Sequence, residues 1–167
     1  APLAAYKTVR PEVKYGTKSR VDFLLTEPGL PDAYVEVKNV HLRRSGDLAE
    51  FPDSVTARGL KHLDELAKMV ESGARAVMLY VIQRSDCGRL AMAADLDPDY
   101  AAGVKEAQAR GVELLAHRCL FTPPNVEAPA ITLGPEIEIV EPAPSTLAAA
   151  GEQADTQTGG AVSTADE

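Results

Sequence analysis

Apolar and polar residues alternate along residues 33–40, which predicts a strand. Val35 and Val37 share one face of this strand, and Glu36 and Lys38 share the other. A buried charge is costly unless it is paired or binds a metal. The pattern therefore indicates either a charged site on this face or an exposed edge strand whose polar face is solvated.

An apolar run at residues 20–25 predicts the preceding strand, and its one acid is Asp22. Pro28-Gly29 lies between the two strands and suits the central positions of a type II turn. We therefore expect a hairpin that brings the carboxylate of Asp22 toward the Glu-x-Lys segment.

A repeat of apolar residues every three or four positions predicts a helix that stops at Gly73. Asp53 or Ser54 is expected to cap its N-terminus. The apolar face consists of Leu60, Leu63, Ala67 and Val70.

Residues 74–82 are almost continuously apolar, which is typical of a central strand covered on both faces. Asp97-Pro98 combines a cap with a proline at the first helical position, so a second helix is expected to run to about Arg110. A last strand is expected over residues 112–120.

Three other stretches are expected to lack strands. Residues 43–50 and 83–95 are polar and are interpreted as loops, and Pro11 is expected to start a short helical turn that ends at Gly16. The element order predicts an α/β fold with a mixed central sheet flanked by helices.

Charge is distributed unevenly. Residues 125–167 contain no Lys or Arg and eight Asp or Glu, so they account for the whole net charge of −8. We expect one domain over residues 1–124, an extended and weakly attached segment over 125–141, and a disordered acidic tail rich in Ala, Pro and Thr over 142–167. The first twenty residues are basic, which suits an anionic partner.

Cys87 and Cys119 match neither a metal-binding spacing nor a disulfide framework, so two reduced thiols in a cytoplasmic protein are expected. No apolar run is long enough for a membrane span, and no signal peptide opens the chain. The chain also lacks an initiator Met, which indicates either processing or a fragment of something longer.

Asp22, Glu36 and Lys38 are the residue types that magnesium-dependent phosphodiester cleavage requires. Mg²⁺, or Mn²⁺ in its place, prefers oxygen ligands, and the peptide carbonyl of Val37 is a further candidate ligand. A bound metal lowers the pKa of its water, and a nearby lysine can orient that water and stabilise developing negative charge. Any charged edge of a hairpin can have the same composition, so an exposed edge strand with a solvated polar face remains an alternative interpretation.

Several segments together closely resemble the sugar fermentation stimulation protein A (SfsA) family. The resemblance covers about residues 8–122, with the motifs in the same order. The motifs are Arg20–Leu25, Tyr34–Val40, Phe51–Leu63, Val81–Asp86 and Gly111–Cys119.

The resemblance implies a fold like that of PD-(D/E)XK nucleases, and DNA binding as the activity. By position, Asp22 matches the first acid of that motif, Glu36 the second acid and Lys38 the lysine. Glu12 is a candidate for the acid that some such nucleases place on a preceding helix. The family carries an oligonucleotide-binding (OB) barrel before this domain, and nothing in this sequence corresponds to it.

Five residues are expected to contact DNA, with basic side chains binding phosphates. For the basic residues of the first long helix, including His62, a solvated face with pairs such as Lys61–Glu65 is the alternative. The five residues are Lys18, Arg20, Arg58, Lys61 and Gln83.

Two residues keep two interpretations, and a third is expected to be structural. Gln83 either positions a water or a phosphate, or caps a loop. His41 either touches phosphate or is solvated, and His117 is expected to be a structural histidine on an apolar strand.

The favoured hypothesis is a DNA-binding protein of the SfsA family with a nuclease-type fold and a Mg²⁺ site, and whether it cleaves DNA as a metal-dependent nuclease is left open. The alternatives are a non-catalytic DNA-binding regulator of sugar metabolism genes and a phosphodiesterase acting on something smaller than DNA. Whether the protein forms a homo-oligomer is left open.

Overall fold

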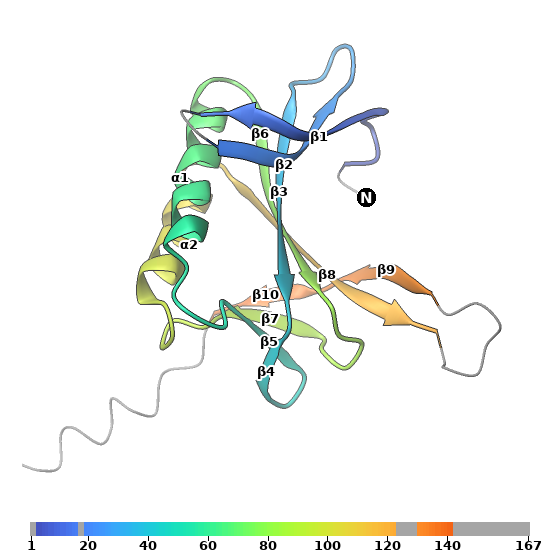
Figure 1. Ribbon diagram of the computed structural model, residues 1–167, viewed down its shortest axis with the longest axis vertical. Coiled ribbons are helices and arrows are strands. Elements are labelled where there is room, and N and C mark those ends of the chain that lie inside the picture. The colour runs from blue at the N-terminus through green and yellow to red at the C-terminus, as the bar shows by residue number, and fades with distance from the viewer. Residues whose placement is uncertain (1–2, 17–18, 123–129, 142–167) are drawn as a thin grey trace, which may run out of the picture.

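The computed structural model describes residues 3–16, 19–122 and 130–141. Within them the chain forms one six-stranded sheet, one four-stranded sheet and two helices (Figure 1). The larger sheet contains, in spatial order, β1 (Thr8–Tyr15), β2 (Ser19–Thr26), β3 (Ala33–Val40), β6 (Arg75–Ile82), β8 (Glu113–Phe121) and β9 (Ile131–Glu136).

The larger sheet is mixed. β1, β2 and β3 pair antiparallel, β3, β6 and β8 pair parallel, and β9 returns antiparallel to β8. The predicted hairpin of β2 and β3 is therefore confirmed, and so is the mixed α/β architecture.

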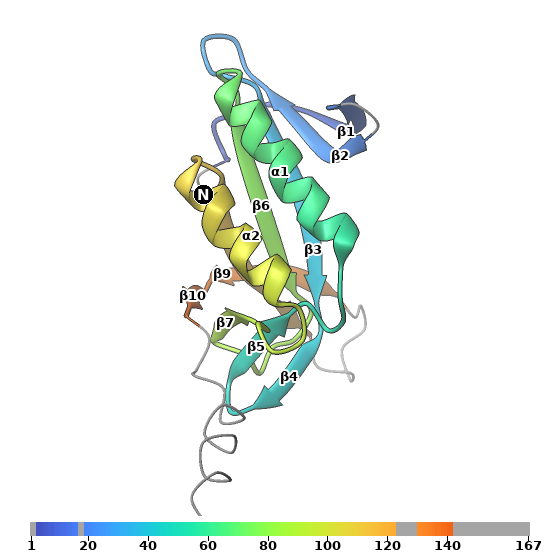
Figure 2. The ribbon, with the colours of Figure 1, turned by 90° about the vertical axis from the view of Figure 1, so that its left-hand side faces the viewer.

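Both helices, α1 (Ala57–Glu71) and α2 (Pro98–Ala109), lie on the same face of the larger sheet (Figure 2). The main core fills the space between them and the sheet. Met78 and Tyr80 of β6 are fully buried there, and the hydroxyl of Tyr80 lies 2.8 Å from that of Tyr100 in α2.

The opposite face of the sheet has a smaller apolar cluster without helical residues. Val35, Val77 and Leu115 come from three neighbouring strands, and Tyr6 packs on them from the segment before β1. β6 is therefore buried completely on the helical side and only in part on the other, where Leu79 and Val81 are half-buried.

The four-stranded sheet lies at the end of the molecule where β3 and β6 finish (Figure 1). Its strands are, in spatial order, β10 (Glu138–Val140), β7 (Arg89–Met92), β5 (Leu48–Phe51) and β4 (Leu42–Ser45). The loop predictions for 43–50 and for part of 83–95 are therefore wrong. Their polar side chains pair with one another across the sheet and its turn: Arg44 donates to Glu50 at 2.8 Å, and Arg89 donates to Asp47 at 2.7 Å.

The predicted helical turn after Pro11 is also wrong, because Pro11 lies inside β1 opposite Phe23 of β2. As the first strand in the sheet order, β1 can accommodate a proline without losing a central ladder bond.

The predicted cap of α1 at Asp53 or Ser54 is wrong as well. Thr56 caps the helix, since its Oγ1 accepts from the N–H of Gly59 at 3.1 Å. The predicted cap at Asp97 and the stop at Gly73 are confirmed.

The chain after β8 was expected to be extended and weakly attached. β9 and β10 are extended, and each joins a sheet at an edge. The predicted tail at 142–167 lies outside the described residues. Neither helix in the described part of the chain has the length and apolar character that crossing a bilayer would require.

Candidate functional site

The hairpin of β2 and β3 brings Asp22 to the Glu-x-Lys segment. Asp22 Oδ2 accepts a hydrogen bond from the N–H of Val37 at 2.7 Å. Because Val37 stands between Glu36 and Lys38, this bond joins the first acid to the second half of the predicted motif. Asp22 is half-buried, so its carboxylate reaches both the chain and solvent.

Glu36 and Lys38 form a buried ion pair. Glu36 is 3% exposed, and Lys38 Nζ donates to its Oε1 at 2.9 Å. His62 Nδ1, from α1, contacts the same oxygen and lies 3.3 Å from Lys38 Nζ. The three side chains therefore meet at one carboxylate oxygen between β3 and α1.

The position of β3 explains why these charges are buried. β3 is an inner strand, and its Glu36 and Lys38 pair in register with Met78 and Tyr80, which belong to the main core under the helices. The alternative of a solvated edge strand is therefore wrong. β2 and β6 flank the strand, and α1 covers the charged face.

Opposing effects act on the pKa of Glu36. Burial raises it, but the hydrogen bonds and charges of His62 and Lys38 outweigh burial and hold it below its ordinary value. Glu36 is therefore an ionised carboxylate in the neutral range, as a cation ligand must be.

His62 does not lie on the exposed face of α1, which both a phosphate contact and a solvated helix face would require. It is 4% exposed, and its second ring nitrogen, Nε2, lies 3.4 Å from Nε of Arg58 one turn earlier on α1. His62 thus connects an exposed arginine to the buried carboxylate of Glu36.

Glu65 is an acid that the sequence interpretation missed as part of the site. It pairs with Lys61 as expected, at 3.5 Å, but it is only 4% exposed. It follows His62 by three positions and thus shares its helix face. Lys61 and Asp64 beside it are charged as well, so no local signal in the sequence singles Glu65 out.

Several buried oxygens of β1, β3 and α1 lack a hydrogen-bond partner within the described residues. They are Glu36 Oε2, both carboxylate oxygens of Glu65 and the hydroxyl of Tyr15. Buried polar atoms are nearly always bonded, so this group requires an explanation.

The structure brings part of the predicted DNA-contacting set toward the site. Arg58 and Lys61 are both exposed on α1, and Lys61 Nζ donates to Ser19 Oγ at the start of β2 at 3.3 Å. Arg20 is the next residue and is also exposed. Lys18 lies outside the described residues.

Gln83 is not brought to the charged face. It is exposed just after β6, and its N–H donates to the carbonyl of Val40 at 2.9 Å. The β6 residues on its side, Leu79 and Val81, pair with Val37 and Asn39 instead of the charged residues. A phosphate contact by Gln83 stays a prediction.

Glu12 does not lie on a helix. It is an exposed residue of β1, and it has a left-handed backbone with a φ of 53°.

The two other histidines lie outside the charged cluster. His41 is exposed, and His117 has a structural partner because its Nδ1 lies 3.0 Å from the carbonyl of Gly134.

Among the residues that the structure describes, no three His, Cys, Asp or Glu side chains converge as a preformed metal site. The predicted set has two carboxylates and a peptide carbonyl, so it does not need a third such side chain. The ligand role of Val37 stays a prediction.

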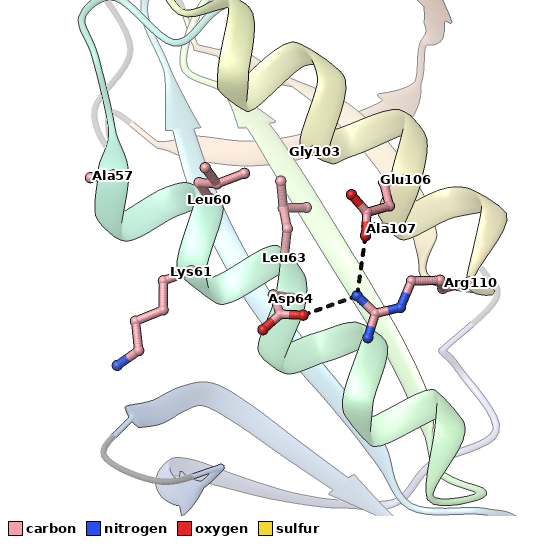
Figure 3. Close-up of a pocket in the computed structure, with 9 residues that line it drawn as sticks. All are labelled: Ala57, Leu60, Lys61, Leu63, Asp64, Gly103, Glu106, Ala107 and Arg110. Atoms are coloured by element: carbon pink, nitrogen blue, oxygen red, sulfur yellow. Dashed lines mark hydrogen bonds and ion pairs between the residues drawn. The ribbon is translucent and has the colours of Figure 1, made fainter.

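A separate hollow of about 360 Å³ lies between α1 and α2 (Figure 3). Arg110 crosses it and lies 3.0 Å from Asp64 and 3.7 Å from Glu106. The hollow does not contain the Glu36 cluster. Its lining consists of Ala57, Leu60, Lys61, Leu63, Asp64, Gly103, Glu106, Ala107 and Arg110.

Comparisons with known proteins give a consistent result. The model of the sugar fermentation stimulation protein RE domain matches residues 1–125. A sugar fermentation stimulation protein homolog of Dinoroseobacter shibae is 65% identical over 132 residues, which are 79% of this chain and 52% of that protein. A homolog of Agrobacterium fabrum is 59% identical over 124 residues, which are 74% and 52% of the two chains.

One solved structure is titled "The structure of Pyrococcus Furiosus SfsA in complex with Ca2+". It matches with a TM-score of 0.73 and 27% identity, over 83% of this chain and 57% of that one. The chain thus spans about half the length of the curated relatives that it matches.

Proposed function

The chain belongs to the sugar fermentation stimulation protein (SfsA) family, and on that premise we propose that it binds DNA and hydrolyses phosphodiester bonds with Mg²⁺ or Mn²⁺ held at Asp22 and Glu36. The observation that carries the proposal is that Asp22, Glu36 and Lys38 lie together, although they come from two strands. The nuclease-like fold agrees with this reaction, but a fold alone does not establish an activity.

The donor set fits a hard divalent cation. Asp22 and Glu36 offer carboxylate oxygens, and Glu36 Oε2 is buried without a hydrogen-bond partner. The carbonyl of Val37 is the third proposed ligand. The related Pyrococcus furiosus protein has been solved with Ca²⁺, which prefers the same kind of ligand.

When bound, such a cation would supply an acidified water and neutralise charge on the phosphate. The side chains of this chain perform the rest. Lys38 Nζ, beside Glu36, would orient the attacking water and stabilise the negative charge that develops. His62 holds the Glu36 carboxylate in place from the helix side.

DNA phosphates would be bound by the basic residues next to this site. Arg58 and Lys61 are exposed on the first helix, and Arg20 is exposed on the neighbouring strand. Lys18 and Gln83 complete the proposed contacts. Phosphate contacts of this kind make binding strongly dependent on salt.

One observation favours the second candidate, a non-catalytic DNA-binding regulator. The ammonium group of Lys38 already binds Glu36 and contacts His62, so at most one of its three N–H donors is left for a water. In a regulator this cluster would serve only to hold the domain together or on DNA.

A digestion assay separates the two candidates. Supercoiled plasmid and short duplexes are incubated with the protein and Mg²⁺ or Mn²⁺, and the Lys38→Ala and Glu36→Gln variants are compared with wild type. Cation-dependent cleavage that is lost in both variants supports the nuclease. Salt-sensitive DNA retention without cleavage, equal in all three proteins, would leave only the regulator.

A further inference from the structure

We propose that Glu65 of α1 supplies, with Glu36, a further carboxylate to the cation site, an inference that rests on the proposed function. The occupant is a hard divalent cation such as Mg²⁺, Mn²⁺ or Ca²⁺. The acids of the described residues do not converge as a preformed site, so Glu65 would reach the cation from the helix by a change of side-chain conformation, whereas the predicted motif draws only on strands.

Burial makes Glu65 an unusual acid. It is 4% exposed, and neither of its carboxylate oxygens has a hydrogen-bond partner in the part of the chain that the structure describes. Leaving a buried charged group without partners is among the most costly arrangements in a protein. Glu36 adds a third such oxygen, its Oε2, from the facing strand.

Lys61 compensates this charge only in part. Its Nζ lies 3.5 Å from Glu65 Oε1, but the lysine side chain is 51% exposed and also donates to Ser19. An ion pair with a solvated partner contributes little. Lys61 can therefore turn to solvent or to a DNA phosphate when a cation takes its place.

The surroundings place the Glu65 carboxylate against the end of β1. A Cβ added at Gly16, after β1, would lie only 3.1 Å from Glu65 Oε1, so the carboxylate packs against the end of this strand. The residue before it, Tyr15, is 6% exposed and directs an unpartnered hydroxyl into the same region.

Electrostatics agree with this placement. Burial first, and then the negative charges of Glu36, Glu65 and Asp22, raise the pKa of Tyr15 above its ordinary value. The negative charges of three carboxylates, from β2, β3 and α1, thus act on the hydroxyl of Tyr15.

Helix geometry explains how α1 delivers the acid. His62 contacts Glu36 from α1, and Glu65 stands three positions later on the same face. A helix that holds the buried carboxylate of Glu36 at one turn therefore presents a second carboxylate at the next. Water would complete the shell, as is usual for Mg²⁺.

The test measures cation binding directly. Mn²⁺ is titrated calorimetrically into wild type, Glu65→Gln, Asp22→Asn and the control Glu71→Gln, which removes an exposed charge from the same helix. We expect Glu65→Gln to bind Mn²⁺ at least about tenfold more weakly and Glu71→Gln to bind like wild type. Lys61→Met should bind more tightly, because it removes the competing ammonium.

Thermal unfolding of the same proteins adds a second measurement. Without cation, Glu65→Gln should melt at or above the wild-type temperature, because a buried unpaired charge is gone. With Mn²⁺, wild type should gain stability and Glu65→Gln should gain much less. A large loss of stability in Glu65→Gln without cation would overturn the inference, since Glu65 would then have a structural partner.

The outcomes separate this inference from the proposed function. If Asp22→Asn weakens Mn²⁺ binding and Glu65→Gln does not, the proposed site stands and the role of Glu65 is overturned. If only Glu65→Gln weakens binding, Glu65 is a ligand and the site assigned to Asp22 is wrong. Absence of Mn²⁺ binding in wild type would overturn both.

Discussion

At the scale of single residues, Glu36 is held ionised by neighbours that offset its burial. Lys38 comes from the same strand face, and His62 comes from the helix packed on it. Removing either neighbour leaves a buried charge partly unpaired, which is far more costly than losing a surface ion pair. The cluster is therefore both a candidate site and a structural element.

Acidification should weaken the fold through Glu36. Its pKa in the folded protein lies below the ordinary 4.5, so its contribution to stability is present above that pH and is lost as the pH falls through the folded value. We expect the difference in unfolding free energy between wild type and Glu36→Gln to shrink below about pH 4.5. Urea denaturation at several pH values measures this difference, and a constant difference would contradict the assignment.

Glu12 has a backbone conformation that suits glycine, with a φ of 53°. A left-handed conformation costs a non-glycine residue roughly 1–2 kcal/mol in the folded protein. Glycine avoids this cost, but it also makes the unfolded chain more flexible, which cancels part of the gain in stability. Glu12→Gly should therefore raise the unfolding free energy by about 0.5–1 kcal/mol.

Glu12→Ala is the matched control, because it removes the same side chain and keeps the strain. It should give no gain in a denaturant titration. Equal effects of the two substitutions would mean that the side chain, and not the backbone, decides the stability at this position.

At the scale of elements, Asp97 links the two helices that cover the sheet. Its Oδ1 accepts from the N–H of Tyr100 in α2 at 2.9 Å, and its Oδ2 accepts from the N–H of Thr56, the cap of α1, at 2.7 Å. One buried carboxylate thus fixes the N-termini of both helices, and α1 in turn holds His62 against Glu36.

Asp97→Ala should be clearly destabilising. It removes a helix cap and leaves a second N–H without its partner, which together cost about 2–4 kcal/mol. Asp53→Ala, at the exposed acid that the sequence suggested as the cap, should stay within about 0.5 kcal/mol of wild type. Equal losses in the two variants, measured by chemical denaturation, would refute the shared cap.

At this scale the sequence does not reveal which polar residues bond to each other, because the partners lie apart along the chain. Asp97 was identified as the cap of α2 because proline follows it directly, but its bond to Thr56 joins residues 41 positions apart. The β4–β5 hairpin was missed for a similar reason, since Arg44 and Glu50 have the composition of a solvated loop and their side-chain ion pair forms only in the folded hairpin.

At the scale of the whole molecule, the order of strands and helices follows from local patterns that the sequence contains. The β2–β3 hairpin, β6 and both helices were each predicted, from apolar patterns in the strands and the first helix and from the Asp97-Pro98 start of the second helix. The second sheet has no such signal, because its strands are short and β7 joins β10, whose residues lie about fifty positions further along the chain.

The candidate site was predictable only in part. The positions of Asp22, Glu36 and Lys38 on two adjacent strands could be inferred from alternation alone. The burial of His62 and Glu65 could not, because it depends on how α1 is rotated over β3. Such a rotation is set by packing against the whole core and not by any local pattern.

The central claim is that Asp22 and Glu36 hold a divalent cation, and crystals of the protein soaked in Mn²⁺ test it most directly. An anomalous difference map should place a Mn²⁺ peak within about 2.2 Å of a carboxylate oxygen of both Asp22 and Glu36. A map without a peak at these residues, from crystals that take up Mn²⁺ elsewhere, would contradict the claim.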